Sequence, residues 1–344
     1  MRSRVDPPVF LELARSLPIV DTRSPAEYLS GHIPGAINIP LFNDAERDAV
    51  GKAYKQRGRR AAVLEGLEYV GPTLASKLTS AIKTAPGGEL LVYCWRGGMR
   101  SDSLAWLFET GDLRPTLLEG GYKSYRNHIL DQLAIRRKTL VLGGMTGSGK
   151  TDILQILEQR GEQMVDLEMI ASHRGSAFGS LGQGNQPSTE HFANLLFDRW
   201  RDLDFGRTIW LEDESRNIGS VFLPELFWNN MQSSPVLAIM SSISTRLPRL
   251  VRDYSLFPPD ELIASVKRIS KRLGGDRTAD AVKAIETADF AKAAEITLTY
   301  YDKAYLYSLH RRDKELIHTL QSETGDAEQN AAMVIEYARD KGLL

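Results

Sequence analysis

The fold is decided by residues 90–101, LLVYCWRGGMRS, which contain Cys94, the only cysteine among the 344 residues. The apolar run before Cys94 predicts a buried strand of a parallel sheet. Ser101 and the apolar positions within 104–108 predict a helix directly after the loop. A strand that passes through a short loop into a helix is the repeating step of an α/β fold, so this stretch predicts that class.

The loop after Cys94 has the composition of an anion site. Gly97 and Gly98 allow the backbone to turn tightly, because glycine adopts positive φ without steric cost. The following helix start is electropositive, and Arg96 and Arg100 add two charges. Such surroundings lower a thiol pKa from about 8.5 into a range of roughly 3.5–7.5. We therefore predict a thiolate beside a bound anion. The structural alternative is a small buried hydrophobic residue.

The chain around this stretch alternates strands and helices. We predict short strands at residues 18–23 and 36–40, mostly helix from 43 to 83, a strand at 115–118, and a helix to about 135. This alternation predicts a parallel sheet, in which sites lie beyond the carboxyl ends of the strands. Asp21 and Arg23 fall at such an end, as Cys94 does.

Three motifs of residues 10–135 resemble a rhodanese domain. They are DTRSPAEY (21–28) with GHIPGA (31–36), the loop CWRGGM (94–99), and the closing turn EGG (119–121). The resemblance implies that Cys94 carries a chalcogen as a persulfide or an equivalent. For Asp21 and His32 we expect the structural role of holding the turn and the loop.

A second domain, predicted at residues 136–245, begins with a strand at 139–142 and the motif GMTGSGKT (144–151). The motif is a P-loop, whose glycines turn backbone N–H groups onto a diphosphate while the lysine adds charge and the threonine can hold Mg²⁺. The predicted diphosphate-binding residues are Gly144, Gly147, Gly149, Lys150 and Thr151. Further strands near 164, 208 and 236 complete a P-loop kinase-like α/β domain.

The acidic partner of the P-loop has two candidates. Residues 208–213 are an apolar strand that ends in Glu212 and Asp213, and residues 164–166 end in Asp166. Either acid could orient Mg²⁺ through water, and either could be a helix cap or an ion-pair partner; no metal ligand is assigned. The predicted substrate-lining residues are Arg174, Glu212, Asp213 and Arg216. Arg174 and Arg216 are candidates to clamp a phosphate or carboxylate, or else to form surface salt bridges.

Residues 246–344 are predicted as a helical region without strands, with tRNA contact expected there. Basic residues and tyrosines lie close together in this region, a mixture that suits phosphates and unstacked bases. The alternative is a solvated helix face with core tyrosines. These residues are Arg246, Arg249, Arg252, Lys267, Arg268, Lys271, Arg272 and Arg277, with Tyr300, Tyr301, Tyr305 and Tyr307.

Composition excludes several classes of protein. The net charge of −1 gives no global attraction to nucleic acid, so any basic surface is local. No apolar run approaches the roughly 18 residues of a membrane span, and the first residues lack the apolar core of a signal peptide. A single cysteine excludes an internal disulfide and fits a reducing compartment. We expect a cytoplasmic protein with no membrane contact, in which anything loaded on Cys94 leaves to another molecule.

The order of motifs resembles the tRNA 2-selenouridine synthase family over nearly the whole chain. Besides the loop at 94–101, the resemblance rests on HRGSAFG (173–179), EDESR (212–216) and YYDK (300–303). It implies a tRNA with 2-thiouridine at the wobble position, selenophosphate as selenium donor, and geranyl diphosphate as a co-substrate that alkylates the sulfur first. Asp102 departs from the family, in which a small residue is usual there.

The resemblance gives each predicted site a task. The Cys94 loop would hold the phosphate of selenophosphate while the thiolate attacks selenium. The P-loop would hold the diphosphate of geranyl diphosphate, and the apolar residues 222–228 could house the prenyl chain or be plain helix core. We expect no tightly bound cofactor. Mg²⁺ is a candidate ligand, and selenophosphate synthase is a candidate partner.

Two other functions fit parts of the same sequence. Cys94 and Arg100 satisfy the C-x5-R spacing of phosphatases that surround a phosphate with a thiolate loop. A nucleotide-gated binding module with an inactive rhodanese domain would also contain the P-loop. Aryl-phosphate turnover without any change in tRNA would favour the phosphatase. Tight ATP binding with indifference to Cys94→Ser would favour the binding module.

Overall fold

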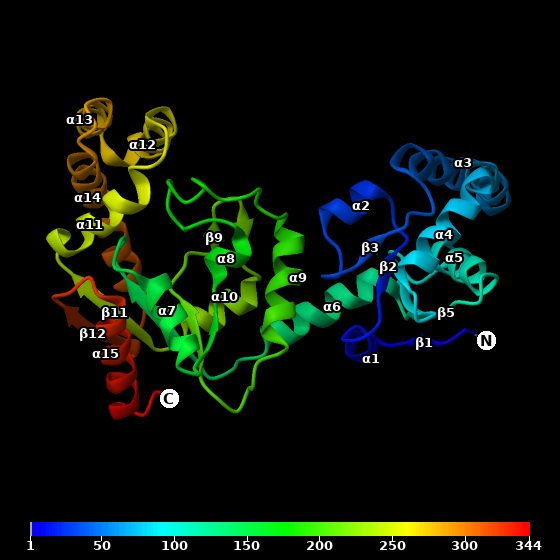
Figure 1. The fold of residues 1–344 in the computed structure, drawn as a ribbon, viewed down its shortest axis with the longest axis horizontal. Helices are drawn as coiled ribbons and strands as arrows, with labels where there is room; N and C mark the ends of the chain where they lie inside the picture. Colours follow the sequence, from blue (N-terminus) through cyan, green and yellow to red (C-terminus); the bar gives the residue numbers. More distant parts are fainter. Residues whose placement is uncertain (1) are drawn as a thin grey trace. The chain divides into compact units, whose positions relative to one another are not determined.

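The computed structural model describes residues 2–344, which form two compact units that the chain divides between Gln132 and Leu133 (Figure 1). We call them the N-terminal unit and the C-terminal unit and describe each by itself. Within the described residues, no helix combines the length and the apolar character needed to cross a membrane.

The N-terminal unit is built on a five-stranded parallel sheet in the order β1-β5-β4-β2-β3. The strands are β1 (Arg4–Val5), β2 (Ile19–Asp21), β3 (Ile37–Asn38), β4 (Glu89–Tyr93) and β5 (Arg114–Leu118). Its central strands are apolar throughout because both faces are covered, and Val20, Leu90 and Val92 are fully buried. This confirms the predicted parallel α/β class for this part of the chain.

The helices of the N-terminal unit include the predicted ones and also α1, which the sequence analysis did not predict. They are α1 (Pro7–Leu13), α2 (Pro25–Ser30), α3 (Asp44–Val70), α4 (Leu74–Thr84), α5 (Met99–Glu109) and α6 (Gly121–Ala134), with a 3-10 turn η1 (Gly71–Thr73). The long α3 is broken at Gly58, where φ is +81°. Glycine is the residue that adopts this conformation at least cost, so the break in α3 has a local cause.

The C-terminal unit contains a second five-stranded parallel sheet in the order β12-β11-β6-β8-β7. The strands are β6 (Thr139–Gly144), β7 (Gln163–Val165), β8 (Ile209–Glu212), β11 (Val236–Ser241) and β12 (Ile317–Ser322), with a small hairpin of β9 (Asn217–Ile218) and β10 (Val221–Phe222). The P-loop strand β6 lies between β8 and β11. The chain adds β7 and β8 on one side of β6 and β11 and β12 on the other side, so β6 is the switch point of the sheet. Ligands of such sheets bind beyond the strand ends at this point.

The helices of the C-terminal unit cover this sheet and extend from it. They are α7 (Lys150–Gln159), α8 (Leu167–Ala171), α9 (Thr189–Trp200), α10 (Glu225–Gln232), α11 (Ile243–Tyr254), α12 (Pro259–Leu273), α13 (Gly275–Glu286), α14 (Phe290–Leu309) and α15 (Ala327–Asp340), with a 3-10 turn η2 (Lys314–Leu316). Helices α11–α14 pack on one another as the helical cluster, seen in yellow and orange in Figure 1. Val266 and Ile285 are buried between them.

The prediction that no strand follows residue 245 was wrong. Strand β12 pairs in parallel with β11, from Val236 opposite Ile317 to Ser241 opposite Ser322. Its sequence IHTLQS buries only Leu320 and Ser322 deeply, because it lies at the edge of the sheet. A half-polar edge strand has no apolar run to reveal it. Residues 317–340 therefore complete the P-loop unit, since α15 packs on α7.

Candidate functional site

Cys94 lies directly after β4, at the carboxyl end of the sheet, and its side chain is buried. The Gly98 N–H donates to its sulfur at 3.3 Å, and the Ser101 hydroxyl lies 3.3 Å from the sulfur and 3.0 Å from the Gly98 carbonyl oxygen, which competes for the same proton. Gly98 also precedes the first residue of α5, so the sulfur faces a helix start. Donors and a helix N-terminus both stabilise negative charge on sulfur. The arrangement makes Cys94 the candidate nucleophile of this loop.

The loop is closed from behind by the EGG turn. The Tyr122 N–H donates to the Cys94 carbonyl at 2.8 Å, and the Lys123 N–H donates to the Trp95 carbonyl at 3.0 Å. Gly121, at φ +63°, lies so close that a Cβ there would stand 2.3 Å from the Cys94 carbonyl oxygen and 2.4 Å from the Gly97 nitrogen. Only glycine fits, which explains the rhodanese turn motif physically.

A buried ion pair between Arg23 and Asp21 packs against Tyr122, which directly follows the EGG turn. Arg23 and Asp21 are both fully buried, with Nη2 to Oδ2 at 2.6 Å, and Arg23 also donates to the Gly31 carbonyl. The Arg23 guanidinium stacks 3.8 Å from the centre of the Tyr122 ring. His32 stacks on Tyr28, with ring centres 3.8 Å apart. These contacts agree with the structural role predicted for Asp21 and His32.

The charged residues around the Cys94 loop differ in their exposure and in whether they form ion pairs. Arg96 is exposed. Arg100 is half-buried and both its terminal nitrogens lie on Glu27, whose pKa these bonds lower although burial opposes them. Asp102 forms an ion pair with Arg4. Among the predicted anion ligands, Arg96 is therefore the exposed cation, whereas Arg100 is shared with Glu27, a contact that the sequence analysis missed.

The P-loop has the predicted strand, loop and helix. Strand β6 ends at Gly144 and α7 begins at Lys150. Gly147 and Gly149 have φ of +82° and +84°, and a Cβ at Gly149 would stand 2.8 Å from the Arg249 guanidinium. The loop borders a polar cavity of about 540 Å³, which we call the P-loop cavity. Its volume is within the range of small-molecule sites.

The contacts of Glu212 distinguish the two acidic candidates. Its Oε1 accepts from the Thr151 hydroxyl at 3.4 Å and lies 3.9 Å from the Lys150 Nζ. Asp166 instead caps α8, accepting from the Met169 N–H at 2.8 Å. Asp213 is held by Arg312, with an Nη2 to Oδ1 distance of 2.6 Å. Glu212 is therefore the acid in direct contact with the P-loop residues, because β8 is the direct neighbour of β6.

Three carboxyl groups converge beside Lys150. Oxygens of Glu168, Glu212 and Glu214 all lie within 4.8 Å of one another, a geometry that can hold a metal ion. Burial and the nearby Glu168 raise the pKa of Glu212 well above its usual range, and the same causes raise the pKa of Glu214. Acids this close cannot all be ionised without a compensating cation. We call these residues the glutamate cluster.

The two arginines predicted to line the substrate site, Arg174 and Arg216, lie in different surroundings. Arg174 is exposed and lines the P-loop cavity. Arg216 pairs with Glu225 at 3.1 Å and is outside the residues that line the cavity, so the structure does not bring it together with the other predicted residues. Its position in the EDESR run put it next to the site in sequence only. Arg249, which pairs with Asp152, lines the cavity instead.

Part of the predicted RNA surface is interior. Arg246 is buried, paired to Asp302 at 2.7 and 2.8 Å, and donates to the Thr146 carbonyl at 3.0 Å. It therefore fixes the P-loop to α14 and was wrongly assigned to RNA contact. Tyr301 accepts from the Ala177 N–H at 3.0 Å. The predicted basic residues that stay exposed are Arg252 in α11 and, along α12 and just after it, Lys267, Arg268, Lys271, Arg272 and Arg277.

The geometry defines a class: a rhodanese-like unit with a cysteine loop, followed by a P-loop α/β unit. The model of the rhodanese-like domain matches residues 10–128, and the model of the tRNA 2-selenouridine synthase AAA domain matches residues 137–339. The chain belongs to the tRNA 2-selenouridine synthase family. This confirms the resemblance of the motifs.

Relatives in this family match along most of their length. The tRNA 2-selenouridine synthase of Bordetella petrii is 35% identical, covering 95% of this chain and 93% of that protein. The one from Nitrosomonas europaea is 33% identical, covering 86% and 90%. The one from Pseudomonas fluorescens is 38% identical over 76% of each chain.

Proposed function

We propose that the protein converts wobble 2-thiouridine of tRNA to 2-selenouridine, and that Cys94 carries the selenium. The observation that supports this most is the sulfur of Cys94 at a helix start, held by the Gly98 N–H and the Ser101 hydroxyl in a chain of this family. Cysteine sulfur is a nucleophile that forms covalent intermediates in catalysis. The relatives named as tRNA 2-selenouridine synthases support the substrate.

The step on Cys94 is transfer of selenium from selenophosphate. The Sγ thiolate attacks selenium, the S–Se bond forms, and the Se–P bond breaks with its electron pair left on phosphorus. The co-product expected from that balance is phosphite. A phosphorylated Cys94 would instead mean attack at phosphorus, in which the S–P bond forms and the P–Se bond breaks with selenium leaving as selenide. Water would then hydrolyse the S–P bond and release phosphate. The two courses differ in the oxidation state of phosphorus, which ³¹P NMR reads directly.

The second activity assigned to the chain is S-geranylation by the C-terminal unit. The tRNA sulfur attacks C1 of geranyl diphosphate, the S–C bond forms, and the C–O bond breaks with its electrons leaving on pyrophosphate. Lys150 and the loop amides neutralise that leaving group. The P-loop cavity supports this assignment, because it has room for a diphosphate and its lining includes Arg174 and Arg249.

Mg²⁺ fits the glutamate cluster chemically. Carboxylate oxygens are its preferred ligands, and the Oε2 atom of Glu212 is buried without a hydrogen-bond partner. Glu212, through its contact with Thr151, would hold the ion at the diphosphate. A bound ion would supply positive charge for the departing pyrophosphate.

The exposed basic face of α12 is the proposed tRNA contact of the C-terminal unit. It holds Lys267, Arg268, Lys271 and Arg272 on successive helix turns, and lysine and arginine bind phosphates. Selenophosphate synthase remains a candidate partner that would deliver the selenium donor.

The experiment that tests the proposed function is mass analysis of tRNA nucleosides from cells with and without this gene. We expect 2-selenouridine and geranylated 2-thiouridine to disappear with the gene and to return with the wild-type copy. Unchanged levels of both nucleosides would contradict the proposed function.

A further inference from the structure

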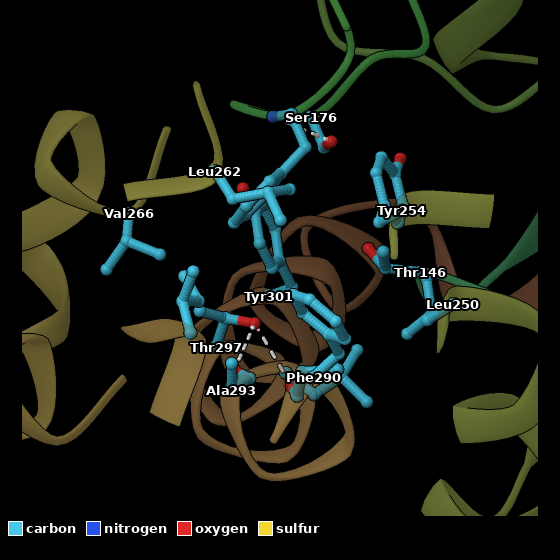
Figure 2. A pocket seen from close by; sticks show the side chains of 14 residues that line it. Thr146, Ser176, Leu250, Tyr254, Leu262, Val266, Phe290, Ala293, Thr297 and Tyr301 are labelled. Atoms are coloured by element: carbon cyan, nitrogen blue, oxygen red, sulfur yellow. Dashed lines mark hydrogen bonds between the residues drawn. The ribbon is translucent and has the colours of Figure 1, made fainter. Parts of the chain in front are cut away.

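The basic and aromatic residues predicted to meet RNA in the C-terminal unit are partly interior, as Arg246 shows. Tyr254 and Tyr301 likewise line an apolar cavity between helices α11 to α14 (Figure 2). The N-terminal unit presents the same mixture of residues on its surface. In α3, residues 54–60 (YKQRGRR) are all exposed, and Tyr54 is 59% exposed. The function proposed for Cys94 leaves this segment without a role.

Helix α3 is a hairpin of two helical arms, residues 44–57 and 59–70, joined at Gly58. Gly58 has φ +81° and ψ 179°, a conformation that is essentially restricted to glycine. Beyond it, the second arm folds back on the first. Gly66 lies so close to Val50 that an added Cβ would stand 3.8 Å from the Val50 Cγ2 atom. The two residues are equally far from Gly58 along the chain, so the arms run in opposite directions.

An ion pair across the bend braces this hairpin. Arg57 at the end of the first arm pairs with Glu65 in the second. A straight helix would separate residues eight apart by about 12 Å along its axis, so the fold-back brings the two side chains together. Residues 54–60 are therefore the exposed end of a braced helical hairpin. We call this segment the α3 tip.

The α3 tip carries three cations that have no acidic partner among the described residues. They are Lys55, Arg59 and Arg60. The acids that flank the tip along the chain, Asp48 and Glu65, are each engaged by another cation. Unpaired lysine and arginine side chains at a surface are free to bind phosphate. Because the net charge of the chain is −1, this positive surface is a local feature of the tip.

The base of the hairpin lies beside the Cys94 loop. The Ala26 N–H donates to the Asp44 Oδ1 atom at 2.9 Å, so α2 is joined to the first residue of α3. In the same helix α2, Glu27 holds Arg100 of the Cys94 loop. At about 1.5 Å per residue, the first arm rises about 20 Å from this base. The α3 tip is therefore held about 20 Å away from the part of the hairpin that adjoins the loop.

We propose that the α3 tip binds phosphates of the tRNA arm whose nucleotide is modified at Cys94. The inference rests on the proposed function, which makes tRNA the substrate, and it adds the surface of the N-terminal unit that holds this RNA. A stacked strand rises about 3.4 Å per nucleotide, so 20 Å corresponds to about six nucleotides. A wobble nucleotide at Cys94 would then place the α3 tip at the stem that flanks the anticodon loop. Phosphate contacts of this kind position a nucleic acid without reading its sequence.

RNA fits the α3 tip better than an acidic protein surface does. The buried core of a protein interface is built from apolar and aromatic anchors, whereas residues 55–60 contain no apolar side chain. Interfaces with nucleic acid are more polar and much more positively charged. A protein partner such as selenophosphate synthase is the alternative that the experiment must exclude.

The test compares two triple variants of the full-length protein. In the tip variant, three cations of the α3 tip lose their charge through Lys55→Gln, Arg59→Gln and Arg60→Gln. The control variant loses the same charge at exposed positions elsewhere in the N-terminal unit, through Arg15→Gln, Lys83→Gln and Arg114→Gln. Denaturant titration checks that both variants keep the stability of wild type.

Fluorescence anisotropy measures binding of a tRNA with 2-thiouridine at the wobble position as the salt concentration rises. Each phosphate contact contributes about 0.7–0.9 to the slope of log K against log salt, so the tip variant should lose about 2 to 3 of that slope. Its affinity at about 0.15 M salt should fall about 10- to 100-fold. The control variant should keep the slope and affinity of wild type. Arg59→Gln alone should lose about one unit of slope, and this result decides if the triple variant does not fold.

The outcomes separate the α3 tip from the function on which the inference rests. If wild type does not bind this tRNA, the proposed substrate fails and the inference fails with it. If wild type binds and the tip variant keeps its slope and affinity, the inference alone is overturned. Equal losses in the tip and control variants would overturn it too, because net charge would then explain them. A tip variant that keeps tRNA but no longer binds selenophosphate synthase would make the α3 tip a protein-docking surface instead.

Discussion

The Cys94 loop and the P-loop use the same backbone device for different chemistry. Each follows a buried parallel strand, turns through glycines of positive φ and opens a helix whose N–H groups face the site. In the Cys94 loop, Gly121 of the EGG turn packs directly against the Cys94 carbonyl and the Gly97 nitrogen, and the loop presents one buried sulfur. The P-loop opens onto a cavity of about 540 Å³ with a lysine and clustered acids. A closed loop suits a covalent carrier, and an open one suits a departing diphosphate.

The largest expected effect separates the two loops by chemistry. Cys94→Ser removes the nucleophile while keeping the hydrogen-bond geometry, so selenium incorporation should fall by about 10³-fold or more. The geranylated nucleoside should persist or accumulate, because the P-loop is untouched. Mass analysis of tRNA from cells that carry this variant checks both statements. Normal 2-selenouridine would contradict the role of Cys94.

The reciprocal change is Lys150→Ala in the P-loop. Loss of a charged donor to the diphosphate should weaken geranyl diphosphate binding about 10- to 100-fold, measured by calorimetry. Arg216→Ala is the control, since Arg216 pairs with Glu225 outside the cavity. An affinity equal to wild type in Lys150→Ala would remove the diphosphate role from the P-loop.

A third change tests the closure of the Cys94 loop. Gly121→Ala forces a Cβ to 2.3 Å from the Cys94 carbonyl, so the free energy of unfolding of the N-terminal unit should fall by about 3 kcal/mol or more. Gly87→Ala, with nothing within 4 Å of its Cβ, is the control. Denaturant titration measures the difference. Equal free energies of unfolding for the two variants would contradict the requirement for glycine at position 121.

The smallest effect concerns pH. Burial first, and Glu168 second, raise the pKa of Glu212 above its ordinary 4.5, so the folded state keeps a proton that the unfolded chain releases. The stability that this proton contributes is complete below pH 4.5 and is lost as the pH rises toward the raised pKa. Denaturant titration across that window should show a falling stability.

The change Glu212→Gln should flatten this fall by up to about 1.4 kcal/mol per pH unit. The exposed Glu225→Gln is its control. If the free energy of unfolding depends on pH equally in the Glu212→Gln variant and in wild type, the raised pKa of Glu212 is contradicted.

The sequence predicted what is contiguous and missed what only the fold brings together. The Cys94 loop and the P-loop each occupy a single stretch, so spacing revealed their strand, turn and helix. Glu168 approaches Glu212 and Glu214 from a separate segment, and Glu27 reaches Arg100 across 73 residues, so no local pattern marked these contacts. Strand β12 is half-polar at an edge, and its pairing with β11 is visible only in three dimensions.

The most direct test of the central claim is mass spectrometry of the intact protein after exposure to selenophosphate without tRNA. The account predicts that one selenium atom is added to the peptide that contains Cys94, and that reducing thiols remove it. It also predicts no addition in Cys94→Ser. An unmodified Cys94, or a phosphate on its sulfur in place of selenium, would contradict the account.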